Sequence, residues 1–351
     1  MPKKIIVGIL DWGLGHATRC IPLIDYMLQT ECQIFIAASG PQRKILQEAF
    51  PSLSFLDPPP YQIQYPPRGK NLVFSIIKQL PRLRKIIKSE HDWLQKAITE
   101  YGIDLIISDN RYGFQARGVH SVMITHQLAP KSGMGTLIDR IARIFQYHYI
   151  NQFDECWVPD LREQGGLAGE LSHPNSVPER TIYIGPLSRF SKAKAEGSPK
   201  LLVLISGPEP ARSEFEELMR AQLQNYHRPY LLVRGLPGSP SIPGPKELNH
   251  ASTETLGRLL EEASLVICRS GYTTVMDLVR LGKKAVLVPT PGQTEQEYLA
   301  QHLQKRNMFP FMLQSAFVLE KAIEMSETFS AAMPTVDFDA FHAALDRVIK
   351  Q

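Results

Sequence analysis

The sequence lacks several signals that would place it in common functional classes. Its four cysteines, Cys20, Cys32, Cys156 and Cys268, are far apart and have no C-x-x-C spacing of the kind that metal and redox sites use. We therefore predict free thiols in a reducing cytoplasm. No apolar run approaches the roughly 18 residues that cross a bilayer. The first apolar stretch ends at Asp11 without a signal-peptide cleavage site.

Charge of one sign is also scarce. The chain has 39 Lys and Arg against 35 Asp and Glu, a formal net charge of +4. This excess is too small to indicate a nucleic acid partner, and no aromatic-basic array accompanies it. At 351 residues the chain is longer than one hydrophobic core usually supports, so we expect two domains.

Short β-branched runs alternate with helical patterns in both halves, which is typical of parallel sheets built from βαβ units. The predicted strands are 4–10, 32–38, 53–56, 103–108, 121–125, 154–158, 200–205, 229–233, 264–268 and 284–288. A polar, turn-rich linker over 185–199 separates the halves. We predict an α/β fold with two doubly wound, Rossmann-like domains, 1–187 and 188–351, facing across a cleft. Whether the last helix crosses back to the first domain is left open.

A histidine lies in the first strand-to-helix turn. The sequence GLGH, residues 13–16, partly matches a dinucleotide fingerprint, but Thr18 replaces its third glycine and no acid follows the next strand. Arg43 and Lys44 keep a reading with a phosphorylated nicotinamide cofactor open. His16 has a reference pKa of about 6.5, which suits proton transfer at neutral pH. A capping or core histidine is the alternative.

A second cluster lies in the C-terminal half. A predicted strand ends at Cys268, and the Ser270-Gly271 turn leads into a helix that Thr273 and Thr274 open. The amides and dipole of a helix N-terminus form an anion site. Asp277 lies one to two turns further on, where a carboxylate could accept bonds from paired hydroxyls. An ordinary N-capped helix is the alternative.

These residues resemble glycosyltransferase family 28, the group of GT-B fold that contains the lipid-linked N-acetylglucosaminyltransferase of peptidoglycan synthesis. In the C-terminal half the resemblance rests on Arg269-Ser270-Gly271, Thr274, the acid at 277, Gly282, Pro289 and Gln296-Glu297-Tyr298. Elsewhere it rests on Gly13-x-Gly15-His16, Thr125-His126-Gln127, Gly185-Pro186 with Arg189, and Ser206-Gly207 with Ala211-Arg212.

The resemblance implies an inverting, metal-independent transfer of a sugar from UDP to a hydroxyl acceptor, with no cofactor beyond that substrate. His16 is the expected catalytic group, and His126 and Asp109 are weaker candidates. Gly13 and Arg19 are expected beside the acceptor. The nucleotide-sugar would contact Gly15, Arg189, Ser206, Gly207, Arg234, Ser270, Gly271, Thr273, Thr274, Asp277, Gln293, Gln296 and Glu297.

Within that set, the resemblance implies the ribose at Asp277, the diphosphate near Ser206, Gly207, Ser270 and Gly271, and the sugar near Gln296 and Glu297. The uracil would lie against the loop after Leu231-Leu232-Val233-Arg234 and the helix starting near Leu256. Two departures matter. The family usually has Glu in place of Asp277, and Glu209 would repel a diphosphate unless it turned away.

The segment 68–94 mixes cations with an apolar stripe. It is similar to an interfacial helix on an anionic leaflet, which a lipid-linked acceptor would require. A surface helix packed on its own domain explains it equally well, and Pro81 favours two short helices. We expect a cytoplasmic protein, with contact at the inner face of the membrane left open. The acceptor is a small molecule or lipid-linked.

Two other functions remain open. The loop over 13–20 also resembles that of the hydrolase in pseudaminic acid biosynthesis, which would make the protein a UDP-sugar hydrolase with water as acceptor. A non-catalytic nucleotide-sugar or lipid binding protein is the third possibility. Asp337-Phe338-Asp339 has the D-x-D form that other glycosyltransferases use for Mn²⁺, but helix capping explains it better, so we expect no metal.

Overall fold

The structure is a computed structural model that describes residues 2–61, 72–163, 165–191, 200–240 and 244–350, without the side chains of 72–80. The chain divides into two compact units. Unit 1 comprises Met1–Gly166, Glu170–Leu187 and Asp337–Gln351, and unit 2 comprises Leu167–Gly169 and Ser188–Val336. Residues 68–71 of the basic segment and 192–199 of the expected linker lie outside the described residues.

Unit 1 is built on a seven-stranded sheet in the order β3-β2-β1-β4-β5-β6-β7. All neighbouring strands pair in parallel. The order reverses between β1 and β4, so the strand-to-helix loops that leave these two strands diverge to opposite faces and open a crevice. The strands are β1 (Lys4–Ile9), β2 (Gln33–Ala37), β3 (Ser54–Leu56), β4 (Leu105–Asp109), β5 (His120–Ile124), β6 (Glu155–Val158) and β7 (Thr181–Tyr183).

Unit 2 has a five-stranded parallel sheet in the order β10-β9-β8-β11-β12. Its order reverses between β8 and β11, which makes the loops after these strands the expected binding edge. The strands are β8 (Lys200–Leu204), β9 (Tyr230–Val233), β10 (Glu247–Leu248), β11 (Ala263–Cys268) and β12 (Ala285–Leu287). The α/β class with two doubly wound parallel sheets, predicted from the alternating runs, is confirmed.

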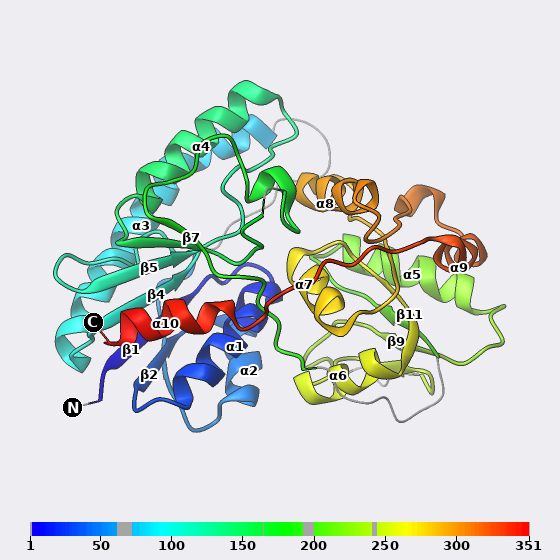
Figure 1. Ribbon diagram of the computed structural model, residues 1–351, viewed down its shortest axis with the longest axis horizontal. Helices are drawn as coiled ribbons and strands as arrows, with labels where there is room; N and C mark the ends of the chain where they lie inside the picture. Colours follow the sequence, from blue (N-terminus) through cyan, green and yellow to red (C-terminus); the bar gives the residue numbers. More distant parts are fainter. Residues whose placement is uncertain (1, 62–71, 164, 192–199, 241–243, 351) are drawn as a thin grey trace. The chain divides into compact units, whose positions relative to one another are not determined.

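Helices lie between many of the strands and after the last strand, β12 (Figure 1). In unit 1 they are α1 (Leu14–Leu28), α2 (Gly40–Ala49), α3 (Leu72–Tyr101), α4 (Thr136–Ile150) and α10 (Ala340–Lys350). In unit 2 they are α5 (Ala211–Leu223), α6 (Thr253–Glu262), α7 (Tyr272–Leu281), α8 (Thr294–Lys305) and α9 (Leu319–Thr328). Short 3₁₀ helices cover Gly169–Leu171 and Gln314–Ala316.

The prediction that Pro81 divides the basic segment into two short helices is wrong. α3 runs through Pro81 as one helix of 30 residues. An internal proline removes one backbone hydrogen bond and costs about 3 kcal/mol. Ile87, Leu94 and Ala97 are buried on one side of this helix. Burying side chains of this kind contributes roughly 1.5–3 kcal/mol for each large aliphatic group, which offsets the proline.

The last helix, α10, belongs to unit 1 and packs on α1 (Figure 1). The Tyr26 hydroxyl donates to an Asp346 carboxylate oxygen at 2.8 Å, and the Tyr26 ring stacks on His342 with 3.9 Å between centroids. Arg347 forms an ion pair with Glu155, on β6. The C-terminal segment therefore completes the N-terminal unit.

Candidate active site

The reversal of strand order in unit 1 brings two distant segments together. β1 leads into a loop that ends at Gly13, where φ is +76°, a conformation that favours glycine and turns the chain into α1. A Cβ at Gly13 would meet no atom within 4 Å, so this turn is open. His16 lies in the first turn of α1, and Asp109 is the last residue of β4. The crevice at the reversal therefore holds both side chains.

His16, Asp109 and Arg19 form one hydrogen-bonded cluster. His16 Nδ1 lies 2.7 Å from Asp109 Oδ1 and 2.9 Å from an Arg19 terminal nitrogen. Arg19 Nε donates to Asp109 Oδ2 at 2.5 Å, and its terminal nitrogen pairs with the other carboxylate oxygen. The Asp109 side chain is 0% exposed, whereas the His16 side chain is 15% exposed. The imidazole is therefore the member of this pair that a substrate can reach.

The charges of the cluster are set by opposing effects. Burial disfavours ionisation of Asp109, but Arg19 and His16 outweigh it and hold the Asp109 pKa well below its usual range. Burial lowers the pKa of His16, and Arg19 adds to that effect against the attraction of Asp109. At neutral pH the cluster thus contains an ionised carboxylate and a neutral imidazole. Asp109 is therefore an ionised hydrogen-bond acceptor beside His16.

Two further side chains border the cluster. His126 follows β5, and its Nδ1 lies 3.1 Å from an Arg19 terminal nitrogen. The Cys20 thiol donates to Asp109 Oδ2 at 3.3 Å. Burial raises the pKa of the Cys20 thiol well above its usual value, so it is a neutral group. The structure thus brings together all three side chains that the sequence analysis named as catalytic candidates.

Arg19, which was predicted to lie beside the acceptor, has an inward position in the structure. Arg19 is 2% exposed and points into the unit, where its guanidinium bonds Asp109. Arg19 lies on the same face of α1 as His16, because the two are three residues apart. A face of α1 that turns toward β4 is buried, and the sequence alone did not show this.

In unit 2 the loops after β8, β11 and β12 lie close to one another. Gly207 has φ +113°, and a Cβ there would come 3.9 Å from Thr290 Oγ1. Gly271 caps α7, and the Ser270 hydroxyl donates to the backbone oxygen of Gln296 at 2.8 Å. Ser270 therefore ties the start of α8 to the start of α7. The open backbone at Gly207 and the N-terminus of α7 have the geometry that suits an anion.

Gln293, Gln296 and Glu297 shape the loop between β12 and α8. Gln296 Oε1 accepts from the Thr290 amide at 2.9 Å, and its Nε2 donates to Gln293 Oε1 at 2.5 Å. Glu297 Oε1 accepts from the Gly292 amide at 2.9 Å. All three side chains are partly exposed. Thr273 and Thr274, in the first turn of α7, are also partly exposed.

Asp277 is buried within α7 at 6% exposure and has its own partners. The Ser188 hydroxyl donates to Asp277 Oδ1 at 2.7 Å. Burial raises the Asp277 pKa to about 6, against the lowering effects of Arg189 and Ser188. Arg189 donates to the Thr253 hydroxyl at 3.2 Å. The carboxylate is thus held in a desolvated position where added hydroxyl donors would stabilise its charge.

Comparisons with known proteins show similarity to glycosyltransferases. Residues 252–331 match the model of the glycosyltransferase family 28 C-terminal domain. An uncharacterized glycosyltransferase of Methanosarcina acetivorans is 24% identical over 315 residues, which cover 84% of this chain and 79% of that protein. The chain is therefore a glycosyltransferase whose residues 252–331 match the C-terminal domain of family 28.

Two more matches support the assignment. The UDP-N-acetylglucosamine–N-acetylmuramyl-(pentapeptide) pyrophosphoryl-undecaprenol N-acetylglucosamine transferase of Methylorubrum populi is 32% identical over 156 residues, 36% of this chain and 40% of that enzyme. The crystal structure of Acinetobacter baumannii MurG aligns over 100% of both chains, with a TM-score of 0.56 and 15% identity. This glycosyltransferase therefore has the GT-B fold, as the resemblance implied.

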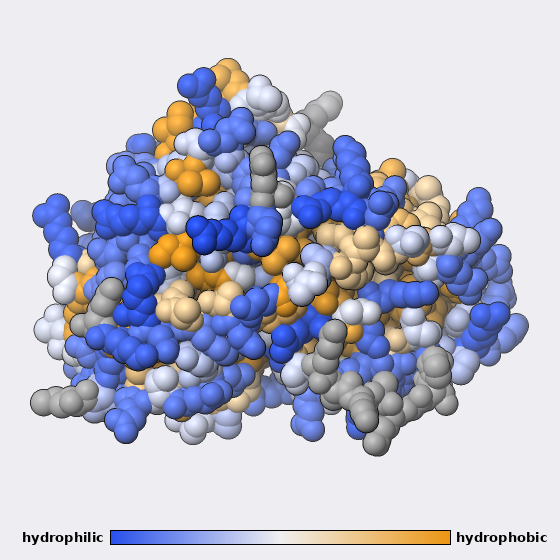
Figure 2. Space-filling view, in the orientation of Figure 1, coloured by the Kyte–Doolittle hydropathy of each residue, from blue (hydrophilic) through white to orange (hydrophobic). Residues whose placement is uncertain are grey.

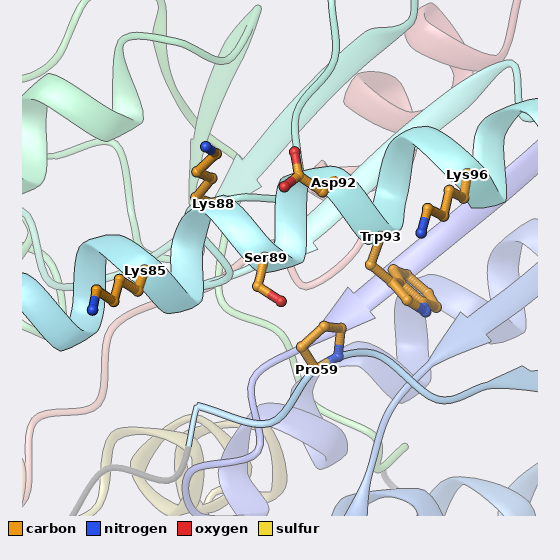
Figure 3. A pocket seen from close by; sticks show the side chains of 7 residues that line it. All are labelled: Pro59, Lys85, Lys88, Ser89, Asp92, Trp93 and Lys96. Atoms are coloured by element: carbon orange, nitrogen blue, oxygen red, sulfur yellow. The ribbon is translucent and has the colours of Figure 1, made fainter.

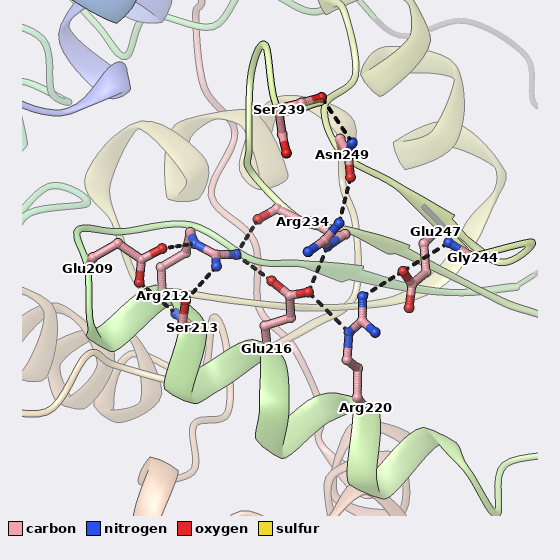
Figure 4. Close-up of polar contacts among 10 residues, drawn as sticks. All are labelled: Glu209, Arg212, Ser213, Glu216, Arg220, Arg234, Ser239, Gly244, Glu247 and Asn249. Carbon is pink, nitrogen blue, oxygen red and sulfur yellow. Dashed lines mark hydrogen bonds and ion pairs between the residues drawn. The ribbon is translucent and has the colours of Figure 1, made fainter. Parts of the chain in front are cut away.

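Arg234, which was expected near the uracil, forms hydrogen bonds with other side chains of the protein. Figure 4 shows a network in which Glu216 Oε1 accepts from Arg234 Nε at 2.7 Å and from Arg220 Nε at 3.0 Å. Arg234 also donates to Asn249 Oδ1 at 2.7 Å. These bonds hold the guanidinium among protein groups, so the structure does not present it as a base-binding side chain.

The same network includes Glu209, the acid that would repel a diphosphate unless it turned away. Its carboxylate accepts from Arg212 Nε at 2.6 Å, and Arg212 in turn donates to Glu216 and to the backbone oxygen of Arg234 (Figure 4). Arg212 lowers the pKa of Glu209 against the opposing effect of burial. Glu209 is therefore turned toward α5, and its charge is balanced by Arg212.

Two residues beside the predicted donor loops of unit 2 were not among the predicted site residues. Ser188, the partner of Asp277, lies in the segment read as a linker. Arg269 is 1% exposed and donates to the backbone oxygens of Val288, Pro289 and Ala211. It therefore joins the loops after β11 and β12 to the start of α5. Hydrophobic periodicity in the sequence indicates neither residue. Their partners lie in loops that are distant along the chain and come together only in the folded protein.

The remaining cysteines and acids have structural positions. The four cysteines are free, with three buried and Cys32 partly buried. Asp337 Oδ1 accepts from the Asp339 amide at 2.9 Å just before α10. Within the described ranges, no cluster of three or more His, Cys, Asp or Glu side chains is placed to hold a metal ion. The described helices include none that is long and apolar enough to cross a membrane.

Proposed function

We propose that this glycosyltransferase moves a sugar from a UDP-sugar to a hydroxyl acceptor with inversion and without a metal ion. The acceptor hydroxyl gives its proton to the His16 imidazole as its oxygen attacks the anomeric carbon. The new carbon–oxygen bond forms on the face opposite the diphosphate, and UDP leaves with the electron pair of the broken bond. The observation that carries this proposal is the reachable His16 held by the buried, ionised Asp109.

The donor assignment is supported by the groups that line the loops of unit 2. The N-terminus of α7 and the open backbone at Gly207 suit a diphosphate, and the Asp277 carboxylate suits a pair of ribose hydroxyls. Gln296 and Glu297 suit sugar hydroxyls. The family 28 C-terminal domain covers α7 and α8, and the Methylorubrum populi relative is named for a UDP-N-acetylglucosamine donor.

The leaving diphosphate needs positive charge, and the protein supplies it without a metal in this proposal. α7 points the positive end of its dipole at the Gly271 turn. Arg269 stands directly before that turn, and although burial lowers its pKa to about 10, it is protonated at neutral pH. Fixed donors of this kind stabilise charge that develops in the transition state.

For the acceptor we propose a small molecule or a lipid-linked sugar reached by peripheral contact with an anionic leaflet. Lys85, Lys88 and Lys96 line a shallow pocket beside α3 and are exposed (Figure 3). On α4, Leu137, Ile141 and Ile144 are 69%, 53% and 61% exposed, and hydrophobic residues gather over that helix in Figure 2. Cations and exposed apolar groups together favour an anionic membrane surface.

Vesicle co-sedimentation tests that contact. We expect binding to vesicles that contain phosphatidylglycerol and little binding to vesicles of phosphatidylcholine alone. Changing Ile141 and Ile144 to Ser should weaken binding to the anionic vesicles. Equal recovery of wild type and variant in the pellet would contradict the membrane contact.

Donor identity is tested by thermal shift with UDP, dTDP, GDP and CMP, because a nucleotide that binds the native state raises its melting point. We expect the largest shift with UDP. Transfer is then assayed with UDP-sugars and hydroxyl acceptors, with EDTA present. We expect activity to persist in EDTA.

His16→Ala tests the base. We expect kcat to fall by roughly 10²–10⁴-fold, the usual contribution of general base catalysis, with UDP affinity unchanged. His227→Ala, which alters an exposed histidine of unit 2, should leave both unchanged. Release of free sugar from UDP-sugar at full rate without an acceptor would select a hydrolase. Unchanged biological activity of His16→Ala would select a binding protein.

A further inference from the structure

The Arg19 guanidinium contacts both histidines of the catalytic cluster. One terminal nitrogen lies 2.9 Å from His16 Nδ1, and the other lies 3.1 Å from His126 Nδ1. A guanidinium has only N–H donors and does not accept hydrogen bonds, and it stays charged at every relevant pH. An imidazole nitrogen next to this guanidinium therefore has two options. It is unprotonated and accepts a hydrogen bond from Arg19, or it is protonated and donates to a different acceptor.

At His126 the contact with Arg19 determines which ring nitrogen carries the proton. Because the Arg19 nitrogen can only donate, His126 Nδ1 must accept, and it carries no proton in that contact. A neutral imidazole then has its proton on Nε2. His126 presents a donor at Nε2, so this nitrogen cannot take a proton from an acceptor hydroxyl.

At His16 the Asp109 carboxylate favours the other tautomer, with the proton on Nδ1. Asp109 Oδ1 lies 2.7 Å from His16 Nδ1, and an ionised carboxylate can only accept. A lone pair on Nδ1 would face the lone pairs of that oxygen, whereas an Nδ1–H bonds it. The Arg19 terminal nitrogen that lies near His16 Nδ1 also donates a hydrogen bond to Asp109 Oδ1. His16 therefore carries its proton on Nδ1, and its Nε2 is an acceptor.

We propose that Arg19 is a positioning residue that, with Asp109, fixes opposite tautomers on the two histidines, with the proton on Nδ1 of His16 and on Nε2 of His126. This inference rests on the proposed function, because it explains how His16 is held ready to receive a proton. It also gives the two histidines different roles. His16 takes the proton of the acceptor hydroxyl, and His126 acts as a hydrogen-bond donor.

Arg19 is suited to this role by its burial and its number of bonds. It is 2% exposed, it binds both Asp109 oxygens and His126 Nδ1, and it lies 2.9 Å from His16 Nδ1. The charged and titratable groups that face His16 are Arg19 and Cys20 from α1, Asp109 from β4, and His126 from the segment after β5. The positive charge of Arg19 opposes a second proton on His16, so the imidazole remains a neutral base as the solution becomes more acidic.

The test is the tautomer itself, measured by nitrogen-15 NMR on protein with labelled histidine. Long-range nitrogen–carbon-bound proton correlations distinguish Nδ1–H from Nε2–H. In the wild type we expect His16 as the Nδ1–H form and His126 as the Nε2–H form at pH 8. His16→Asn and His126→Asn spectra assign the two signals. The same tautomer on both residues, or the opposite pair, would overturn the proposal without any variant of Arg19.

Arg19→Gln then tests the part played by the guanidinium. We expect loss of the single Nε2–H form at His126 and protonation of His16 at a higher pH than in the wild type. In turnover assays, kcat/KM should fall most at acidic pH and recover as the pH rises. Arg117→Gln, which alters an exposed arginine of unit 1, should leave spectra and pH profile unchanged.

The outcomes separate this inference from the proposed function. An Arg19→Gln protein that keeps both wild-type tautomers and the wild-type His16 titration would overturn the role of Arg19, even if the enzyme transfers sugar. Expected tautomers in a protein that transfers no sugar would contradict the proposed function alone. If Arg19→Gln fails to fold, the wild-type spectra still decide the tautomer pair.

Discussion

Replacing Asp277 by asparagine should make the protein without substrate more stable, and the gain should depend on pH. The carboxylate is buried at 6% exposure with one hydroxyl donor, Ser188, and the Arg189 guanidinium nearby. Burial outweighs both and raises the pKa to about 6. Keeping a charge at this position therefore costs the folded state free energy that an amide does not cost.

The gain in stability expected for Asp277→Asn can be calculated from the raised pKa of Asp277. The pKa of an aspartate in an unfolded chain is about 3.9, so a folded value of about 6 is a rise of roughly two units. Each unit corresponds to about 1.36 kcal/mol, which gives a penalty of about 3 kcal/mol. Because the folded state binds the proton more tightly, the penalty is absent below about pH 4, grows up to about pH 6 and is constant above it.

Urea unfolding of wild type and Asp277→Asn between pH 4 and 8 measures this difference. The three tryptophans, Trp12, Trp93 and Trp157, all belong to unit 1, so unit 2 is followed by amide hydrogen exchange in β11 and β12. We expect the variant to gain about 2–3 kcal/mol at pH 8 and almost nothing at pH 4. Glu217→Gln, an exposed acid on α5, should show no such difference.

Binding of UDP should change in the opposite direction. Asp277→Asn loses the charged acceptor for the ribose, and hydrogen bonds to charged groups contribute about 1.5–3 kcal/mol, so the affinity should fall by at least about tenfold. Wild-type affinity should also fall as the pH drops below about 6, where the carboxylate takes up a proton. A variant that is less stable at pH 8, or a stability difference that does not change with pH, would refute this reasoning.

Two further predictions concern unit 2. Thr290 Oγ1 is buried without a hydrogen-bond partner among the described residues, so Thr290→Val should raise the unfolding free energy by about 1 kcal/mol in the same hydrogen-exchange assay. A lower value would show that the hydroxyl has a partner in solution. Glu216 accepts from three guanidiniums, so Glu216→Gln should reduce the unfolding free energy by about 3 kcal/mol at pH 7. Since Arg212 and Arg234 lower the Glu216 pKa against burial, the loss should shrink as the pH falls below about 4, and a loss that is constant with pH would contradict the ion-pair account.

The sequence was sufficient for most of the fold because buried parallel strands are short apolar runs that few other structures produce. All ten predicted strands lie within a few residues of β1–β6, β8, β9, β11 and β12. The two that were not predicted, β7 (Thr181–Tyr183) and β10 (Glu247–Leu248), have three and two residues. Each of them pairs with the edge of a neighbouring strand, β7 with β6 and β10 with β9, and this pairing exists only in the folded chain.

The candidate site was less predictable, for a physical reason. His16 and Asp109 could be named from the loops that follow strands, because parallel strands gather those loops at one edge. Arg19 and Arg234 could not be placed, because whether an arginine faces substrate or a buried carboxylate depends on the partner. Their partners, Asp109 and Glu216, are 90 and 18 residues away along the chain.

The return of α10 to unit 1 has a consequence for how the protein is made. Lys3, beside β1, donates to the backbone oxygens of Val348 and Ile349, so the first strand and the last helix are joined. Unit 1 therefore cannot be completed until residues 337–351 are present, whereas unit 2 is almost continuous in the chain. We expect a released chain truncated after Val336 to fold unit 2 and to leave unit 1 incomplete.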